Sequence, residues 1–330
     1  MATIKDVARL ANVSVSTVSR AINHSGYVAK DVYDRVLAAM RELNYQPNAV
    51  ARGLVSRKTG SIGLIIPDVA NPFFSDIARG VEDEAIANGY TVILCNTDWN
   101  LQREQMYVRL MQGKWVEGIV LVGSRTPEQE LAALLNGLPI VLADRKPNLL
   151  KSAVWSDNEV GAYLATQHLM DVGCRKIAHI AGPEDSPSAT ARRMGFRRAI
   201  EEQVGVYGTI AQGNFRFDGG YDAAMKLFTA DDPPEGIFAA NDMMAVAVIQ
   251  AANRLGIRIP RDVRLVGYDN ISMSEYVYPS ITTVEQRGYD MGREASKLLL
   301  ALLEQRMDAV LTKELEPTLL IRQSTQTENA

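Results

Sequence analysis

A short segment near the N-terminus carries side chains that could read DNA. In residues 14–23, SVSTVSRAIN, Val18 and Ile22 lie one helical turn apart and would face a core. The side chains left pointing largely outward are Val15, Ser16, Thr17, Ser19 and Arg20. Short hydroxyl side chains let a helix sit deep in the major groove, where Arg20 can donate two hydrogen bonds to guanine O6 and N7. The side chains that suit phosphate oxygens better are those of Thr17, Ser19 and Asn23.

A second group of polar and aromatic residues follows the apolar runs of the remaining chain. The group comprises Phe73 and Phe74, Asp144 and Arg145, Asn241 and Asp242, and Asp269. Aromatic faces contact C–H or ring surface, whereas carboxylates, amides and guanidinium groups bind hydroxyls. These residue types suit a small polyhydroxylated or heterocyclic ligand. Each residue also has a plainer explanation, because the phenylalanines could be core of the next helix and the aspartates helix caps or turn residues.

Two further amphipathic segments flank the DNA-reading segment. The first has an apolar face of Ile4, Val7, Ala8 and Ala11. Thr3 and Asp6 form a variant of the capping box before it, and Ser14 can cap the second helix. The third segment, residues 28–45, supplies Val32, Val36, Met40 and Leu43. A small three-helix core of this kind docks on DNA, although serines and threonines could instead merely cap and solvate a helical bundle.

From Ser61 onward, short β-branched runs alternate with helical stretches. The runs are SIGLIIP, YTVILCN, GIVLVG and PIVLA, followed after Asp157 by KIAHIAG, GIFAAN and VRLVGYD. This alternation predicts α/β structure with parallel sheets and crossover helices, in two similar lobes of roughly 130 residues each. Ligands bind beyond the carboxyl ends of such strands, so two facing lobes would share one cleft.

Charge is divided unevenly between the two parts of the chain. The first 60 residues carry nine Lys and Arg against four Asp and Glu, a net charge of +5. The remaining 270 residues carry −9, which gives the total of −4. A basic head attracts phosphates through counterion release, and an acidic remainder discourages indiscriminate binding.

Several classes of protein are disfavoured. Cys95 and Cys174 lie far apart beside apolar runs, which favours reduced thiols in the cytoplasm over a disulfide. The sequence has no export signal, no run of eighteen apolar residues and no structural metal set, so we expect neither export nor membrane insertion. Phosphate-binding, dinucleotide-binding and zinc-protease motifs are absent, and no catalytic base stands out among His24, His168 and His179. We therefore expect no enzyme activity and no cofactor.

The ordered series of motifs resembles the lactose-repressor-like (LacI/GalR) family of bacterial transcriptional regulators. The motifs are IKDVARLANVSVSTVSRAIN, LNYQPNAVARGL, SIGLIIPDVANPFF, IAGPEDSPSATARRMGF, AANDMMAV and LVGYDN, and the resemblance runs from Thr3 to about Arg322. It implies a helix-turn-helix head, a hinge helix and a two-lobed body like that of periplasmic sugar-binding proteins. It also implies that Val15, Ser16 and Arg20 read bases.

The resemblance assigns boundaries to these parts. The head would span residues 1–47, the hinge helix and linker 48–60, and the effector-binding and dimerisation body 61–330. Because the chain of periplasmic binding proteins crosses three times between lobes, lobe one would comprise about 61–156 and 287–314, and lobe two about 157–286 and 315–330. In the hinge, Ala51 and Leu54 match positions at the minor groove, where a leucine wedge bends the duplex. The alternative for this segment is a disordered linker.

The resemblance also assigns effector contacts. It favours Phe74, Arg192, Phe215, Asn241 and Asp269, and more weakly Phe73, Asp144, Trp155, Ser186, Ser188 and Gln286. Arg145 together with Arg192 could hold an anion. Purine-responsive relatives carry a second arginine where this chain has Ser186, so a neutral sugar, a sugar acid or a phosphorylated sugar is favoured over a purine.

The expected function is that of a transcriptional repressor whose hold on double-stranded, pseudo-palindromic operator DNA is controlled by a small metabolite. A homodimer is expected, since two half-sites give useful affinity and the C-terminal RQSTQTENA lacks the leucine repeat of tetrameric relatives. Three alternatives remain: an enzyme, a transport-type binding protein, and an architectural DNA-binding protein that ignores metabolites. The basic head argues against the second, and a metabolite-dependent shift in melting temperature would exclude the third.

Overall fold

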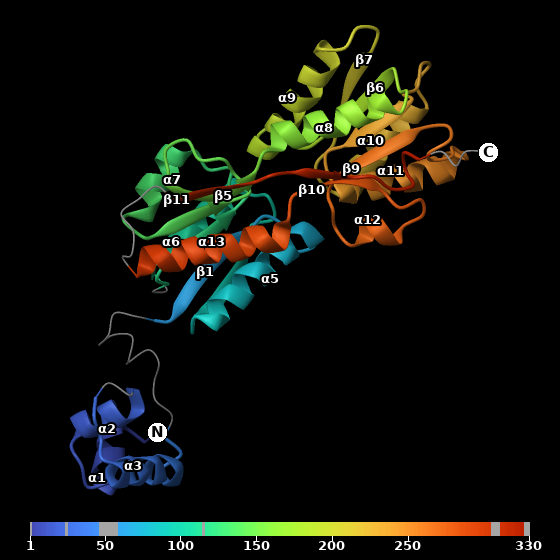
Figure 1. Cartoon of the computed structure of the whole chain (residues 1–330). Coiled ribbons are helices and arrows are strands. Elements are labelled where there is room, and N and C mark those ends of the chain that lie inside the picture. Colours follow the sequence, from blue (N-terminus) through green and yellow to red (C-terminus); the bar gives the residue numbers. More distant parts are fainter. Residues whose placement is uncertain (1, 24–25, 46–58, 114–115, 305–310, 327–330) are drawn as a thin grey trace. The chain divides into compact units, whose positions relative to one another are not determined.

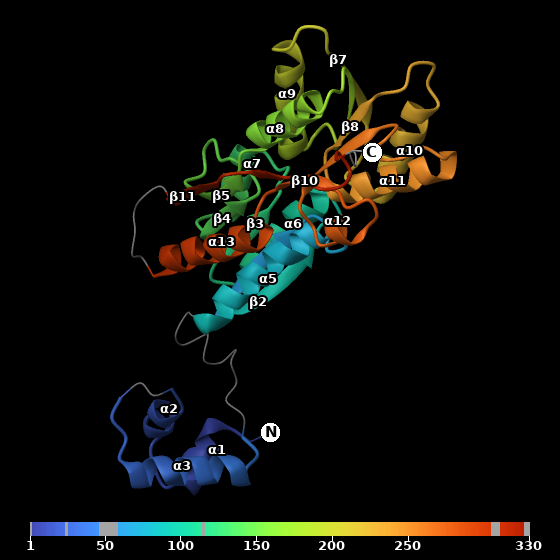
Figure 2. The same ribbon diagram turned by 45° about the vertical axis from the view of Figure 1, so that its right-hand side comes forward.

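The computed structural model describes residues 2–23, 26–45, 59–113, 116–304 and 311–326. The chain forms two compact units, residues 1–59 and 60–330. Figures 1 and 2 show the elements of both units from two directions. Among the described residues, no helix is long and apolar enough to cross a membrane.

The first unit contains three short helices, α1 (Ile4–Leu10), α2 (Val15–Asn23) and α3 (Lys30–Glu42). At the start of α1, the Asp6 carboxylate accepts hydrogen bonds from the backbone N–H and the hydroxyl of Thr3, at 2.9 and 2.7 Å. At the start of α2, the Ser14 hydroxyl accepts from the Thr17 N–H at 3.1 Å. These three bonds satisfy polar groups at the start of the two helices, as the sequence predicts.

The core of the head follows the expected apolar stripes in α1 and α2 but differs in α3. Its buried members are Val7, Ala8, Ala11, Val18, Ala21, Val36 and Ala39. Met40 and Leu43 pack against them, together with Tyr33. The prediction that Val32 belongs to this core is wrong. Residues 33, 36, 40 and 43 form the apolar stripe of α3, and Val32 lies half-buried outside the cluster.

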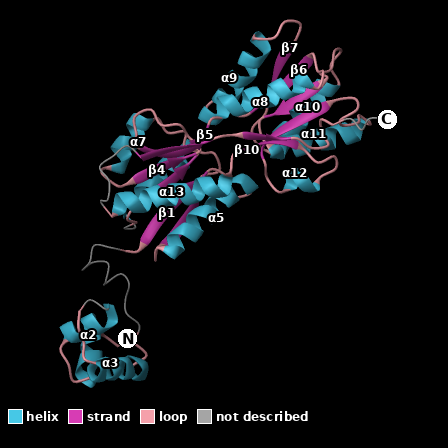
Figure 3. Cartoon of the chain, in the orientation of Figure 1, coloured by secondary structure: helices cyan, strands magenta, loops and turns pink. Residues whose placement is uncertain are grey.

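The second unit is built on two six-stranded sheets with helices on both faces (Figure 3). The first sheet is parallel throughout, in the order β11-β5-β4-β3-β1-β2. Its strands are β1 (Ser61–Ile66), β2 (Thr91–Asn96), β3 (Ile119–Val122), β4 (Ile140–Ala143), β5 (Ser152–Ser156) and β11 (Leu311–Leu315). We call this sheet and its helices lobe one.

The second sheet has the order β12-β10-β9-β8-β6-β7 and is parallel except for the β10–β12 pair. Its strands are β6 (Lys176–Ala181), β7 (Tyr207–Gln212), β8 (Gly236–Ala239), β9 (Arg264–Asp269), β10 (Thr282–Glu285) and β12 (Thr318–Leu320). This sheet and its helices form lobe two. Two such lobes of parallel sheet confirm the predicted fold class.

Each sheet has a hydrophobic core on both faces. In lobe one, α5 (Pro72–Ala87) and α13 (Gly288–Leu303) cover one face, and α6 (Leu101–Gly113) and α7 (Glu128–Leu135) the other. In lobe two, α8 (Asn158–Asp171) and α9 (Pro187–Glu201) cover one face, and α10 (Phe217–Phe228) and α11 (Asp242–Leu255) the other. A short helix, α12 (Met273–Tyr276), follows β9.

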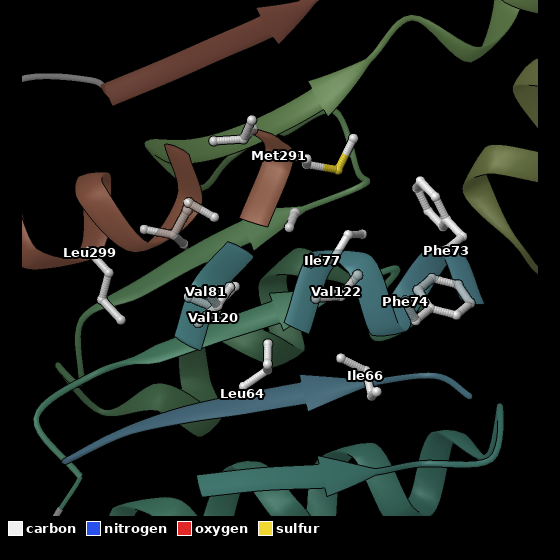
Figure 4. Close-up of a cluster of buried hydrophobic side chains, with 14 of the residues drawn as sticks. Leu64, Ile66, Phe73, Phe74, Ile77, Val81, Val120, Val122, Met291 and Leu299 are labelled. Atoms are coloured by element: carbon white, nitrogen blue, oxygen red, sulfur yellow. The ribbon is translucent and has the colours of Figure 1, made fainter. Parts of the chain in front are cut away.

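The chain passes three times between the lobes, from β5 to α8, from β10 to α13 and from β11 to β12. The second passage brings α13 against α5 in lobe one, where the two helices approach closely at glycines. A methyl group at Gly292 would overlap the backbone carbonyl of Ile77, and one at Gly80 would overlap that of Tyr289. Figure 4 shows the core under these helices, with Phe73 and Phe74 at the first turn of α5.

Candidate functional site

The outward surface of α2 presents the residues expected to contact DNA bases. Val15, Ser16 and Arg20 are exposed. The hydroxyls of Ser16 and Thr17 each share a hydrogen bond with the Ser14 hydroxyl, at 2.7 and 2.8 Å. Thr17 is half-buried, as is Ser19.

The remaining predicted DNA contacts cannot be placed in the same way. Asn23 ends α2, but its side chain lies outside what the structure describes. Ala51 and Leu54 fall in residues 46–58, outside the described residues, so the hinge stays a prediction.

In the second unit, residues from both lobes line one small cavity beyond the carboxyl ends of the strands. They are Asn71, Phe73, Phe74, Trp99, Asp144, Ser188, Arg192, Phe215, Asn241 and Asp269. Eight of these belong to the set expected from the sequence, and Asn71 and Trp99 do not. The free space is about 10 Å³, which is about the room of one water molecule.

Arg192 is the central charged group of this cavity. It projects from α9 and is only 3% exposed. Its Nε donates to Asn158 Oδ1 at 2.7 Å, and its Nη1 donates to the Ala240 carbonyl. Its Nη2 lies 3.5 Å from Asp269 Oδ1, and its guanidinium carbon lies 3.8 Å from the centre of the Tyr268 ring. These contacts fix the guanidinium plane, so its position in the cavity is set before any ligand arrives.

Two buried aspartates share the cavity with Arg192. Burial raises the pKa of Asp144 to about 6, although the nearby Arg192 opposes this shift. Burial also raises the pKa of Asp269 well above its ordinary value, again against the attraction of Arg192. Both residues have positive φ angles, +56° at Asp144 and +106° at Asp269, a backbone region that non-glycine residues rarely adopt. Such strain is typical of binding sites, where the surrounding structure enforces it.

Asn241 and Asn71 each serve their own helix as well as the cavity. The Asn241 amide oxygen accepts from the Met244 N–H at 2.9 Å, and its amide nitrogen donates to the Phe215 carbonyl at 2.9 Å. The Asn71 side chain accepts from the Phe73 N–H at 3.1 Å. Capping therefore holds both side chains at the mouths of their strands.

A series of aromatic rings connects the lobes through the cavity. Phe73 and Phe74 meet edge to face with ring centres 5.3 Å apart, and Phe74 meets Trp99 in the same way at 5.5 Å. Trp99 in turn lies 5.5 Å from Phe215 of lobe two. Trp99 thus fills the space between an aromatic ring of each lobe, which explains why the cavity is small.

Ion pairs also join the two lobes around the cavity. Arg125, which follows β3, donates to Asp185 of lobe two at 2.9 Å, and its guanidinium carbon lies 4.8 Å from the centre of the Trp99 ring. Arg216 of lobe two pairs with Asp98 and lies 3.8 Å from Asp68. The structure therefore has the lobes closed on each other.

Four residues expected at the effector site do not line this cavity. Arg145 donates to the carbonyls of Ser124 and Thr126, at 3.0 and 2.7 Å, within lobe one. It is therefore not positioned to share an anion with Arg192. Trp155 is a buried residue of β5 and lines a neighbouring cavity.

The other two act through neighbours that do line the cavity. The Ser186 hydroxyl caps α9 by accepting from the Ala189 N–H at 3.3 Å, and it lies 3.0 Å from the Ser188 hydroxyl. The Gln286 amide nitrogen donates to Asp269 Oδ1 at 2.7 Å. Ser186 and Gln286 thus hold Ser188 and Asp269 in place.

A metal centre finds no support among the residues that the structure describes. No group of three or more His, Cys, Asp or Glu there could hold a metal ion. His179 is fully buried between the rings of Phe196 and Phe238, and burial lowers its pKa to about 3. Its role is structural.

Comparisons with known proteins agree with the two units. Residues 3–48 match the family model of bacterial regulatory proteins of the lacI family, and residues 166–325 match a periplasmic binding protein-like domain. The ribose operon repressor of Halalkalibacterium halodurans is 42% identical over 326 residues, which cover 99% of this chain and 98% of that one. The transcriptional repressor PurR of Photobacterium profundum is 37% identical, with 98% of each chain covered.

Among solved structures, the lac repressor dimer bound to operator and the anti-inducer ONPF is similar over 99% of both chains. Its TM-score is 0.90, at 27% sequence identity.

Proposed function

The chain belongs to the lacI family of bacterial regulatory proteins and is a DNA-binding transcriptional repressor, and on that premise we propose that a small neutral sugar bound between its lobes controls its hold on operator DNA. Like its relatives, it is a regulator and not an enzyme. Because its partner is DNA, we place its action in the cytoplasm.

The observation that supports a sugar is the set of polar groups that converge on the aromatic cavity. Arg192 and Asn241 come from lobe two with Asp269, while Asp144 comes from lobe one. A guanidinium donates to sugar oxygens, carboxylates accept from hydroxyls, and aromatic faces cover the C–H surface of the ring. This set suits a polyol better than a purely apolar ligand.

Charge favours a neutral sugar over a sugar acid or a phosphorylated sugar. Among the described residues that line the cavity, Arg192 is the one cation, and it already lies beside Asp269 with Asp144 near it. Arg145, which could have added a second positive charge, is bound to lobe-one carbonyls. An anionic ligand would therefore meet two carboxyl groups and only one guanidinium. D-ribose is the first sugar to test, since a 42% identical relative is a ribose operon repressor.

The mechanism follows from the contacts that hold the lobes together. The cavity is about 10 Å³ with Trp99 between Phe74 and Phe215, so a sugar ring needs the lobes or Trp99 to move. A ligand that binds the open and closed arrangements with different affinity shifts the balance between them. In a homodimer this shift changes the spacing of two hinge segments, residues 48–60, and hence the fit of two heads, residues 1–47, to a pseudo-palindromic operator. By linkage, sugar affinity and operator affinity change by the same factor.

The test is operator binding with and without sugar. The full-length protein first selects its operator from random duplexes, and fluorescence anisotropy then gives its Kd at fixed salt in the presence and absence of D-ribose. We expect a sugar-dependent change in Kd of about fivefold or more, the lower end of typical allosteric coupling. Arg192→Met should remove this response, whereas Arg197→Met, an exposed arginine of the same helix, should retain it. An operator Kd that no sugar alters would refute the proposal.

A further inference from the structure

A short turn of lobe one reaches across the cavity to lobe two. The turn comprises residues 97–100, between β2 and α6, and we call it the strap. Its two ends are fixed in lobe one by hydrogen bonds. The Thr97 N–H donates to the Ile66 carbonyl at 2.9 Å, and the Asn100 side chain accepts from the Arg103 N–H at 2.9 Å. The two middle residues of the strap contact lobe two.

The Trp99 ring lies in the space that a sugar ring would need. It meets Phe74 of lobe one and Phe215 of lobe two, in each case with ring centres 5.5 Å apart. It also packs against the hydrophobic cores of both lobes. With the indole in this position, the free space of the cavity is about 10 Å³, the room of about one water molecule. A sugar ring and the Trp99 ring therefore cannot occupy this space together.

Two arginines, one from each lobe, hold the strap in this position. Arg216 of lobe two pairs with Asp98. Arg125 of lobe one covers the Trp99 ring, with its guanidinium carbon 4.8 Å from the ring centre, and its Nη1 donates to the Trp99 carbonyl at 3.2 Å. The same Nη1 donates to Asp185 of lobe two at 2.9 Å. These contacts tie the Trp99 ring to both lobes.

The backbone of the strap is strained at the residues that contact lobe two. Asp98 and Trp99 have positive φ angles of +55° and +57°, a region that non-glycine residues rarely adopt, and they do so in succession. Such a conformation persists where surrounding contacts enforce it. Loss of the contacts to lobe two would let both residues return to ordinary backbone angles. Trp99 is thus a side chain that can leave the cavity while the ends of the strap stay in place.

We propose that the strap is an autoinhibitory element of the sugar site. Trp99 and the sugar ring compete for one space, and the pair between Asp98 and Arg216 favours Trp99. This inference rests on the proposed function, because it takes the cavity to be the sugar site. A ligand that binds only a minor arrangement has its apparent affinity reduced by the fraction of molecules in that arrangement. With Trp99 in the cavity in about nine molecules of ten, removal of the indole tightens sugar binding about tenfold.

The experiment is calorimetric titration of the full-length protein, without DNA, with D-ribose, D-xylose and D-glucose. We expect Trp99→Ala to bind at least one of these sugars about tenfold more tightly than the natural protein does. Arg216→Met keeps the indole but removes the ion pair, so it should bind that sugar about threefold more tightly. The double variant should bind no more tightly than Trp99→Ala, because the ion pair acts through the indole. Arg198→Met is the matched control and should leave the affinity unchanged, since Arg198 pairs at the surface with Glu202 at the end of its own helix, α9.

Tryptophan fluorescence tests the movement of the strap directly. When the indole leaves the space between Phe74 and Phe215, it passes into water. Saturating sugar should therefore shift the emission of the natural protein to longer wavelength, and this shift should be absent in Trp99→Ala. If Trp99→Ala binds sugar more weakly, if the gains of the two substitutions add, or if sugar leaves the emission unmoved, the strap is overturned while the sugar-responsive function stands. If no sugar binds either the natural protein or Trp99→Ala, both proposals fail.

Discussion

Replacing Asp144 by asparagine should change how the stability of the protein depends on pH. Burial raises the pKa of this carboxyl from 3.8 to about 6. In the unfolded chain the group loses its proton near pH 4, whereas in the folded protein it keeps the proton until about pH 6. The folded state therefore binds more protons in this interval, and the free energy of unfolding falls as the pH rises through it. At 1.36 kcal/mol per pKa unit, the shift of about two units corresponds to about 3 kcal/mol.

Asparagine carries no titrating proton, so the free energy of unfolding of the Asp144→Asn variant does not fall for this reason as the pH rises. Relative to the natural protein, the variant should gain stability steadily between pH 4 and pH 7, by about 3 kcal/mol in all. Urea denaturation of both proteins at half-unit pH steps measures the difference. If that difference stays constant across the interval, Asp144 ionises at its ordinary pH and the reasoning from burial fails.

Asp262→Asn provides a control whose pH dependence falls in another interval. Hydrogen bonds from Arg258 lower the pKa of Asp262 to about 2. Its contribution to stability is therefore present above about pH 4 and is lost as the pH falls toward 2. The difference between this variant and the natural protein should be flat from pH 4 to pH 7, where that of Asp144→Asn changes.

Three further outcomes concern the head, the hinge and the helix packing. Arg20→Ala should weaken operator binding by about 1–3 kcal/mol and relax sequence preference, as a fresh operator selection would reveal; an unchanged preference would exclude base reading by this residue. Leu54→Ala should lower operator affinity without lowering the melting temperature of the body, and undiminished affinity in a titration would refute the minor-groove wedge. Gly292→Ala places a methyl group against the Ile77 carbonyl and should destabilise the body by about 3 kcal/mol, whereas Gly113→Ala, which meets nothing within 4 Å, should not lower the urea midpoint.

The parts of the fold that the sequence predicts are those with strong periodic patterns. The runs ending at Ile66 and Ala143 are buried central strands, and their apolar composition identifies them. The run ending at Asn96 is also largely apolar, although it forms β2, a more exposed edge strand. The apolar pattern does not predict β7 and β11. Both are edge strands, with sequences YGTIAQ and LTKEL, and need little apolar surface. The passage of α13 to lobe one came from the resemblance, since no local pattern reports which sheet a helix will cover.

The residues of the candidate site can also be divided into those that the sequence predicts and those that it does not. Residues at or just beyond the ends of strands, such as Asp144, Asn241 and Asp269, line one cavity as the topology requires. Trp99 follows β2 and could have been found by the same rule, whereas the rule placed Arg145 in the cavity wrongly. The direction of a long side chain depends on partners elsewhere in the lobe, here the carbonyls of Ser124 and Thr126.

The interleaving of the lobes has a consequence for the order in which the newly made chain can fold. Lobe one needs α13, which packs on α5 some two hundred residues earlier, and lobe two needs β12, which pairs with β10 near the end of the chain. Neither lobe can complete its core until nearly the whole polypeptide has left the ribosome. The head closes its own small core from the first 45 residues. A ribosome that stalls partway would therefore release a DNA-binding fragment without the body that regulates it.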